Sequence, residues 1–336
     1  MPAYLLILLL AAPSENLERY SRSEPHLGST VSVTLYASSA TEAEAGLLAA
    51  FAEVERLNGI LSDYEPESEL SRLSAASPTA EPVELSRELA TVLRAAEGFS
   101  EKSEGAFDVT IGPLSTLWRR ARRRREMPEA EALRTARAAV GHHHVKLCEV
   151  EGRTLATLDV PGMRLDLGGI AKGYIADEVL RLLAARGLPR AMVNAGGDMA
   201  LGDAPPNEKG WLIGIAPLEA DAPPGTWIAA GKCGVATSGD AFQFVELEGV
   251  RYSHILDPKT GLGVVARSSV TVIAPRGIDA DALASAVSVL GPEKGMALVE
   301  QSAGVEALIV YPHGDRILTK QSRGFSKFIT AAPAGF

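Results

Sequence analysis

The chain has 336 residues, of which 46% are hydrophobic and 22% are charged, and it carries a formal net charge of −9. This composition is typical of a globular protein with a substantial core and argues against intrinsic disorder. The negative charge disfavours binding to phosphate backbones, and an aromatic content of 5% leaves few rings for stacking on bases. Nucleic acid is therefore not an expected partner.

An apolar run at the N-terminus is the first feature along the chain. The stretch Tyr4–Ala12 is too short to span a bilayer, but it resembles the central region of a secretory signal, and small residues follow it. No Lys or Arg precedes the run, and no Cys follows it to carry a lipid. We treat residues 1–20 as a candidate leader, so export to the periplasm or cell envelope is expected if it is a signal, with a cytoplasmic location left open.

The first half of the chain predicts helices and strands in alternation. Apolar side chains at helical spacing predict a helix at 41–61, with Thr41 as its N-cap. The arginine-rich stretch 119–125 predicts a solvated helix that opens a surface hairpin, with a phosphate or partner contact as the alternative. His142, His143 and His144 are expected on a strand, where they would face alternate sides and could not share one metal ion. The other segments expected here are a strand at 28–38, a helix at 86–103 and a strand leading into a turn at 106–117.

The second half predicts shorter segments with irregular alternation. The irregular order and the hairpin-like spacings favour an α+β fold of mixed sheets with packed helices over a doubly wound sheet. No linker long enough to separate independent units is present, so residues 21–332 are expected to form one domain. The expected strands are 164–167, 191–194, 211–216, 233–236, 268–274 and 307–311, and the expected helices are 171–185, 281–290 and 292–301.

The segment from Asp166 to Tyr174 is the first with the features of a binding site. An acid ends a strand, Gly168 and Gly169 permit close approach of a ligand to the backbone, and a helix begins at once. Amides at a helix start suit a phosphate, and Lys172 in the first turns can face it. The spacing matches neither a Walker A loop nor a dinucleotide-binding fingerprint. A tight turn with a surface lysine would look similar.

Two further segments carry polar side chains in suggestive positions. Asp281 and Ser285 stand four residues apart, so on a helix their oxygens share one face and can bind a hard cation such as Mg²⁺. The same pattern would arise if Asp281 only capped or acidified the start of the helix and Ser285 only packed against its neighbours. His254 ends a strand before the turn Asp257–Gly261, where it can act as a general base or as a hydrogen-bonded structural residue.

Taken in order, these segments resemble the FAD:protein FMN transferases, the ApbE-type family. They extend from about residue 27 to about residue 308, which is nearly the whole chain. The resemblance implies an ApbE-like, T-fold-related α+β fold in which FAD binds in a cleft between two subregions, with Mg²⁺ at its pyrophosphate. The matching stretches are LSDYEPESELSRL, GAFDVTIGPLSTLW, LDLGGIAKGYIAD, MVNAGGDM, GVATSGD, HILDPKTG and DADALASAVSVLG.

The resemblance also implies roles for individual residues. Mg²⁺ would be held by the Asp281 carboxylate, the Ser285 hydroxyl and the backbone carbonyl of Gly169. The family usually has Thr where Ser285 stands, so the hydroxyl is kept while the methyl that restricts its rotamer is lost. Tyr64 would lie against a ring of FAD, and Leu27 departs from the Met often found at its position. The full set expected to contact FAD is Leu27, Tyr64, Ala106, Phe107, Asp108, Asp166, Lys172 and Ile255.

The implied reaction transfers FMN from FAD to a protein. A threonine hydroxyl of the target attacks the FMN phosphorus and AMP leaves, with Mg²⁺ neutralising charge in the transition state. His254 would take the hydroxyl proton, and Asp257 would orient His254. Family targets are membrane redox proteins with a Ser/Asp-Gly-Ala/Ser-Thr-Ser/Thr-type motif. This chain lacks that motif, so modification of itself is not expected.

Two other functions stay open at this point. The same site could use water as the acceptor, which would make the protein an FAD pyrophosphatase that yields FMN and AMP. The protein could also be a flavin-binding or electron-transfer protein without turnover. Asp281 together with Ser285 argues against this last function, because a passive carrier does not need Mg²⁺.

Overall fold

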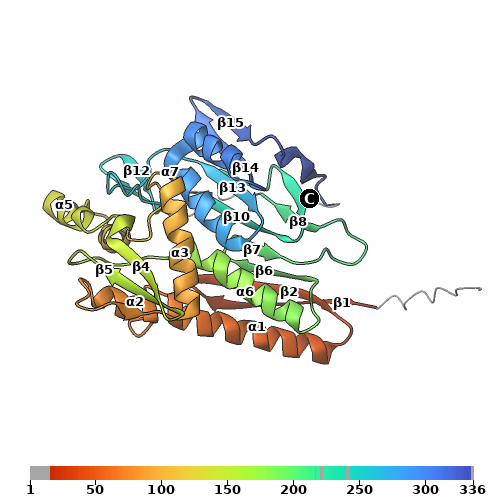
Figure 1. The fold of residues 1–336 in the computed structure, drawn as a ribbon. Helices are drawn as coiled ribbons and strands as arrows, with labels where there is room; N and C mark the ends of the chain where they lie inside the picture. The colour runs from red at the N-terminus through yellow and green to blue at the C-terminus, as the bar shows by residue number, and fades with distance from the viewer. Residues whose placement is uncertain (1–15, 216, 220–221, 240–242, 334–336) are drawn as a thin grey trace, which may run out of the picture.

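The structure is a computed structural model that describes residues 16–215, 217–219, 222–239 and 243–333, so most of the candidate leader lies outside the described residues. Its largest element is an antiparallel sheet of eight strands in the order β1-β2-β6-β7-β10-β13-β14-β15 (Figure 1). The strands are β1 (Glu18–His26), β2 (Ser29–Ala37), β6 (Ala191–Ala195), β7 (Asp198–Leu201), β10 (Cys233–Gly239), β13 (Ser269–Ala274), β14 (Glu306–His313) and β15 (Arg316–Gln321).

Both faces of this sheet are buried over its central strands. Side chains alternate between the faces of a strand, so Ala200 of β7 joins the larger core while Met199 and Leu201 join a second, smaller one. The same alternation sends Ala236 of β10 to the larger core and Val235 to the smaller. The central strands therefore carry apolar side chains on both faces and do not show the strict polar–apolar alternation of a half-exposed sheet.

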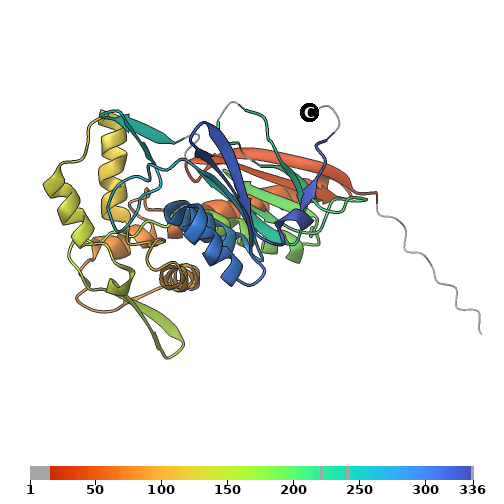
Figure 2. The same ribbon diagram turned by 90° about the horizontal axis from the view of Figure 1, so that it is seen from above.

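Three helices cover one face, and a small sheet covers the other (Figure 2). The larger core lies between the eight-stranded sheet and α1 (Ala40–Leu61), α6 (Ala171–Ala185) and α7 (Gly277–Gln301). The smaller core lies beneath a three-stranded sheet of β8 (Trp211–Gly214), β9 (Trp227–Ala230) and β16 (Ile329–Thr330), where Phe325 of the 3₁₀ turn η2 (Phe325–Lys327) is fully buried.

Two smaller groups of elements complete the fold. One contains α2 (Glu69–Ala75), α3 (Arg87–Lys102) and a sheet of β3 (Val83–Glu84), β5 (Arg153–Leu158) and β4 (Val145–Val150). The other contains α4 (Gly112–Arg124), α5 (Ala130–Ala138) and the hairpin of β11 (Phe244–Leu247) and β12 (Val250–Ser253). This second group, which we call the satellite, has its own apolar cluster of Leu114, Trp118, Ala121, Ala136, Val245, Leu247 and Leu256.

Most of the predicted elements are confirmed, and the α+β class with packed helices is correct; the described strands pair antiparallel in every sheet. The helix predicted at 171–185 coincides with α6. The two helices predicted at 281–290 and 292–301 are halves of α7, which starts earlier, at Gly277, and is interrupted at Gly291, where φ is +75°. Because Pro292 cannot donate a backbone hydrogen bond, the break falls at the residue before it.

Other predictions are wrong, each for a local reason. The stretch 106–117 contains no strand, since α4 begins at Gly112, and 164–167 contributes only a single bridge between Ile111 and Arg164. The histidines at 142–144 form the 3₁₀ turn η1 (His142–His144) before β4, not part of a strand. Strand β1 was missed because its side chains are mostly polar, as suits an edge strand, and β7 because it has only four residues.

Helix α7 is long and apolar enough to cross a membrane by composition alone. More than half of its most apolar stretch is buried within the protein, between α6 and strands β10 and β13. In this fold α7 is a core helix.

Candidate active site

The candidate site is organised by the crossing of α6 and α7. Gly173 of α6 lies against Gly277 of α7, and a Cβ on Gly173 would lie 2.2 Å from the Gly277 carbonyl oxygen. Only glycine therefore allows this approach of the two backbones. At the same point the Gly173 amide donates a hydrogen bond of 3.0 Å to Oδ2 of Asp281. The crossing thus fixes the position of a buried carboxylate.

The crossing also brings the segment before α6 against α7. A Cβ on Gly169 would lie 2.8 Å from the Ser285 hydroxyl oxygen, so the Gly169 backbone touches that side chain. Ser285 stands one turn after Asp281 on α7, as expected for a shared helix face. The three groups expected to hold Mg²⁺ therefore come from two segments that meet here. That they bind a metal stays a prediction.

A hard cation fits the chemistry of these groups. Asp281 is only 4% exposed, and burial together with the nearby Asp198 carboxylate raises its pKa well above the usual range. Its one hydrogen bond found among the described residues leaves lone pairs for a cation. No group of three or more His, Cys, Asp or Glu that could hold a metal is found in the described part of the chain. Such a site would need substrate phosphates as ligands, as Mg²⁺ sites commonly do.

Lys172 and the buried Asp198 form a partly buried ion pair beside Asp281. Nζ of Lys172 lies 3.3 Å from Oδ2 of Asp198. Burial lowers the pKa of Lys172, but Asp198 and Asp281 outweigh it and raise this pKa, so the ammonium stays charged. Sequence reasoning placed Lys172 toward FAD and gave Asp198 no role. The sequence feature that could have pointed to Asp198 is the glycine turn just before it. Asp198 is the first residue of β7, and β7 pairs with β10 near the centre of the main sheet.

A second missed residue, Arg119 of α4, links two loops of the site. Its guanidinium contacts Asp63 at 2.5 Å and Asp166 at 2.8 Å, and its Cζ lies 4.1 Å from the centre of the Tyr64 ring. Burial and the neighbouring Asp166 raise the pKa of Asp63, while Arg119 lowers it. Tyr64 is 69% exposed, so its ring, stacked against Arg119, still offers surface to a planar ligand. The arginine that contacts it lies in the stretch 119–125, for which the sequence predicts a solvated helix, with a phosphate or partner contact as the alternative.

The segment from Ala106 to Asp108 lies beside the same groups. An atom of the Phe107 ring lies 3.4 Å from where a Cβ on Gly169 would stand, so this ring borders the candidate metal groups. Ala106 is buried next to it. The Asp108 carboxylate accepts hydrogen bonds from the Thr110 amide at 2.8 Å and the His142 amide at 2.8 Å. In this structure Asp108 orders the backbone around the site.

The turn between β1 and β2 lies at the same end of the main sheet. Leu27 occupies this turn with a φ of +54° and is partly buried. A Cβ on Gly196 would lie 2.6 Å from the Ser29 hydroxyl, so the turn packs against the loop that leads to Asp198. Leu27 therefore lies at the end of the main sheet that carries Asp198. That it lines the FAD site stays a prediction.

The loop carrying His254 reaches the site from the satellite. Ile255 lines a hollow together with Ser288 of α7, which is three residues beyond Ser285. Nδ1 of His254 lies 3.1 Å from the backbone carbonyl oxygen of Gln243. Because a carbonyl only accepts, Nδ1 carries the proton, and Nε2 of the neutral ring is the nitrogen that can act as a base.

Asp257 has partners within its own turn. Its carboxylate accepts hydrogen bonds from the Lys259 amide at 2.8 Å and from the Thr260 hydroxyl at 3.2 Å. Its backbone also closes the turn, with the Asp257 amide donating to Leu262 at 2.9 Å. These bonds shape the loop that presents His254. The Gln243 carbonyl is a group that orients the imidazole, and no hydrogen bond between the Asp257 carboxylate and His254 is found among the described residues.

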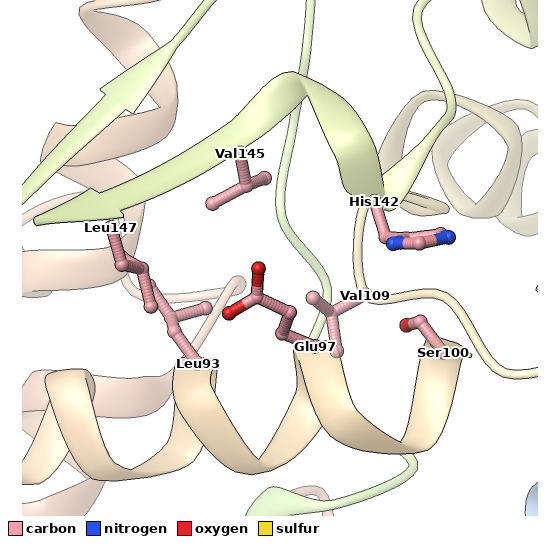
Figure 3. Close-up of a pocket in the computed structure, with 7 residues that line it drawn as sticks. All are labelled: Leu93, Glu97, Ser100, Val109, His142, Val145 and Leu147. Atoms are coloured by element: carbon pink, nitrogen blue, oxygen red, sulfur yellow. The ribbon is translucent and has the colours of Figure 1, made fainter. Parts of the chain in front are cut away.

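A separate hollow lies between α3 and β4 (Figure 3). Leu93, Glu97 and Ser100 of α3 face Val145 and Leu147 of β4 across it, with His142 at one end. It contains none of the residues predicted to bind FAD or Mg²⁺. Its connection to the site is indirect, through the His142 amide bound to Asp108.

Comparison with known proteins places this arrangement in a family. The sequence profile of the ApbE family matches residues 27–309. The chain is 37% identical to the FAD:protein FMN transferase of Treponema pallidum over 310 residues, covering 88% of this chain and 85% of that protein. Its structure is similar to the flavin transferase ApbE of Vibrio cholerae, with a TM-score of 0.82 at 31% identity, covering 93% of this chain and 99% of the other.

A second solved structure agrees. The apo form of the flavinyl transferase ApbE of Pseudomonas stutzeri matches with a TM-score of 0.81 at 31% identity, covering 94% of this chain and 98% of the other. The chain belongs to the ApbE family. The family predicted from the sequence is confirmed, and the relatives matched here carry the names of transferase enzymes.

Proposed function

We propose that this protein transfers FMN from FAD to a threonine hydroxyl of a target protein, releases AMP and requires Mg²⁺. The observation that carries the proposal is the meeting of Gly169, Asp281 and Ser285 at the α6–α7 crossing. These groups would hold Mg²⁺ through a backbone carbonyl, a carboxylate and a hydroxyl. When bound, Mg²⁺ would supply positive charge that neutralises the pyrophosphate of FAD.

The chain's own residues would bind and orient the two substrates. Lys172, in the first turn of α6, would add a partly buried positive charge near the phosphates, held in place by Asp198. The amides of Ile170 and Ala171 at this helix start already donate to the Leu167 carbonyl, so the charge of Lys172 carries this part of the proposal. Tyr64, backed by Arg119, would support a planar ring of FAD. Leu27, Ala106, Phe107 and Ile255 would line the rest of the FAD site, with Asp108 and Asp166 ordering its walls.

His254 is proposed to take the proton of the attacking hydroxyl at Nε2, since Nδ1–H is held by the Gln243 carbonyl. The threonine oxygen forms a bond to the FMN phosphorus, the bond from that phosphorus to the bridging oxygen breaks, and AMP leaves with that oxygen. Asp257 is proposed to act indirectly, by shaping the turn after His254.

The acceptor is proposed to be a membrane redox subunit with the Ser/Asp-Gly-Ala/Ser-Thr-Ser/Thr-type motif. We also propose that residues 21–332 act as one domain, because strands from β1 to β15 share one sheet. Export through the apolar run at 4–12 is proposed as well. The mass of the mature chain from its native cell would contradict export if these residues were retained.

The function is tested by incubating the protein with FAD, Mg²⁺ and a synthetic peptide that carries the threonine motif. We expect the peptide to gain the mass of FMN, AMP to be released in equal amount, and EDTA to stop both. The matched control is the same peptide with Ala in place of the threonine. Release of FMN and AMP without any gain of peptide mass would instead identify an FAD pyrophosphatase. The absence of AMP release with and without EDTA would favour a flavin carrier.

A further inference from the structure

A dense group of arginines stands at the end of α4, in a chain whose net charge is −9. Arg119 belongs to the site through its contacts with Asp63 and Asp166. We call the other five, Arg120 and Arg122–Arg125, the basic end of α4. Within the residues that the structure describes, no ion pair with a carboxylate is found for any of these five.

Arg122 is the member of this group nearest the site. It stands one turn after Arg119 and is partly buried. Burial and the Arg119 guanidinium lower the pKa of Arg122, while Tyr64 acts in the opposite direction. A partly desolvated guanidinium beside a second one is energetically unfavourable unless an anion comes near. Arg122 is therefore placed where a negatively charged group from outside the chain would stabilise it.

Residues of α4 next to the basic end contact both the proposed FAD site and the loop that follows the proposed base. On one side Arg119 stacks on Tyr64, the residue proposed to support FAD. On the other side Trp118 donates a hydrogen bond of 2.8 Å to the carbonyl of Gly261, in the loop that follows His254. Beyond these contacts Arg123, like its two successors, is exposed. The helix and the β11–β12 hairpin, in contact through Trp118 and Tyr252, stand at one end of the molecule (Figure 2). The basic end therefore follows directly on the residues of α4 that contact both loops.

We propose that the basic end of α4 is the docking surface for an acidic segment of the acceptor protein, close to the threonine that receives FMN. This inference rests on the proposed function, because it assigns a surface for the protein substrate. Guanidinium groups match carboxylates with paired hydrogen bonds. Five of them, spread over more than one turn, cover a wider area than one phosphate would occupy. They also give a negatively charged protein a local means of attracting an acidic partner.

Stabilisation of the helix end is the simpler explanation for part of this group. Cations in the last turn interact favourably with the helix dipole, and Arg122, Arg123 and Arg124 occupy that turn. The dipole, however, acts only within that turn, and it does not account for Arg125 beyond the helix or for the partly buried position of Arg122 beside Arg119. A partner of opposite charge accounts for both.

The test uses two fluorescent synthetic peptides that share the threonine motif, one flanked by glutamates and one flanked by lysines. Their dissociation constants are measured by anisotropy for the wild-type chain and for Arg123→Glu/Arg124→Glu, two exposed positions. The matched control is Arg186→Glu/Arg316→Glu, which makes the same charge change at exposed arginines elsewhere. Arg186 ends α6, about 20 Å along that helix from Lys172.

We expect the wild-type chain to bind the acidic peptide at least about tenfold more tightly than the basic one at low salt, and the α4 double variant to lose this preference. The control variant should keep it. The preference should weaken as salt rises, because the screening length falls to about 8 Å at about 0.15 M ionic strength. Equal binding of both peptides by the wild type, or an equal loss in both variants, would overturn the inference. So would Arg-dependent binding to phosphatidylserine vesicles without any preference between the peptides.

AMP release and peptide mass, measured in the same samples, keep this inference separate from the proposed function. In the α4 double variant, KM for FAD should be unchanged, while kcat/KM for the acidic peptide falls about tenfold or more. A rise in KM for FAD would instead assign these arginines to the FAD site and overturn the docking surface. If neither peptide gains mass but the wild type still prefers the acidic one, the docking surface stands and FMN transfer fails.

Discussion

The α6–α7 crossing and the satellite hold their functional groups in different ways. At the crossing, backbone touches backbone through glycines, and Asp281 is buried with its orientation set by the Gly173 amide. In the satellite a much smaller apolar cluster supports the loop of His254 and the exposed arginines of α4. This difference matches the different roles that we propose for the two regions. The groups proposed to hold Mg²⁺ and the pyrophosphate lie in the closely packed main core, while those proposed to meet the acceptor lie on a part supported by a smaller apolar cluster.

The largest effect is expected at the buried carboxylate. Asp281→Asn keeps an oxygen for the Gly173 amide but removes the charge that a cation requires, so AMP release should fall at least about 10²–10³-fold. Magnesium affinity, measured by titration calorimetry, should fall with it, while the melting temperature in EDTA stays close to that of the wild type. Asp279→Asn is the control, since Asp279 pairs with Arg276 at 2.8 Å at the start of the same helix. Retained activity in Asp281→Asn would contradict the metal assignment.

A loss confined to the chemical step is expected in the satellite. His254→Gln removes the proposed base, and general-base catalysis is commonly worth about 10²–10⁴-fold in rate. Because His254 is not among the groups proposed to hold FAD or Mg²⁺, KM for FAD should stay within about twofold while kcat falls. Rapid-quench measurement of AMP separates the two quantities. A large rise in KM with kcat unchanged would show that His254 binds FAD and does not act as the base.

The close packing at the crossing can be tested by comparing two helical glycines, one at the crossing and one away from it. A Cβ on Gly173 would lie 2.2 Å from a backbone oxygen, whereas one on Gly59 of α1 would meet nothing within 4 Å. Gly173→Ala should lower the free energy of unfolding by roughly 1–3 kcal/mol and weaken Mg²⁺ binding. Gly59→Ala should raise it by about 0.5–1 kcal/mol, because alanine favours the helix. If urea denaturation gave the same change in unfolding free energy for both variants, α6 and α7 would be able to move apart and accommodate the added methyl.

A smaller effect is expected at Asp177, which fixes the start of α7. Its carboxylate accepts hydrogen bonds from the amides of Gly277 at 2.7 Å and Ile278 at 3.0 Å, and thereby caps a helix that has no cap of its own. Burial raises the pKa of Asp177 from 3.8 to about 6, against these two bonds; nearby Asp279 also raises it, and Arg276 lowers it. A carboxyl with a raised pKa stabilises the fold below its unfolded pKa, and this contribution is lost as the pH rises through the folded value.

The unfolding free energy of the wild type should therefore fall between about pH 4 and pH 7 by roughly 2–3 kcal/mol relative to Asp177→Asn, which cannot titrate there. Urea midpoints across that pH range measure the difference. Parallel curves for the two proteins would show that Asp177 keeps an ordinary pKa.

The sequence predicted the parts of this site that repeat a local pattern. Helix 171–185 could be found from its apolar spacing, and the shared face of Asp281 and Ser285 from helical geometry alone. The contacts between distant segments could not be found in this way. Neither Gly173 against Gly277 nor Asp198 beside Lys172 has a local signal, because each depends on how α6, α7 and the main sheet pack together.

Arg119 is a further case in which a contact between distant segments could not be predicted from local sequence. Within an arginine-rich stretch it looks like its neighbours, and only the folded chain brings it to Asp63 and Asp166. The turn at 142–144 was missed because its backbone is set by Asp108, more than thirty residues earlier in the chain.

The smallest effect is expected at Ser285. Ser285→Thr keeps the hydroxyl next to Gly169 and adds a methyl that restricts the side chain to fewer rotamers, so less entropy is lost when a cation binds. We expect Mg²⁺ affinity to rise about two- to threefold, with little change in kcat at saturating Mg²⁺. Ser288→Thr is the control, because the Ser288 hydroxyl donates to the Ala284 carbonyl at 2.9 Å and is not among the proposed ligands. A gain in both variants would point to a general stiffening of α7. A loss in Ser285→Thr alone would show that the contact with Gly169 leaves no room for the methyl, which would make serine the residue that this crossing requires.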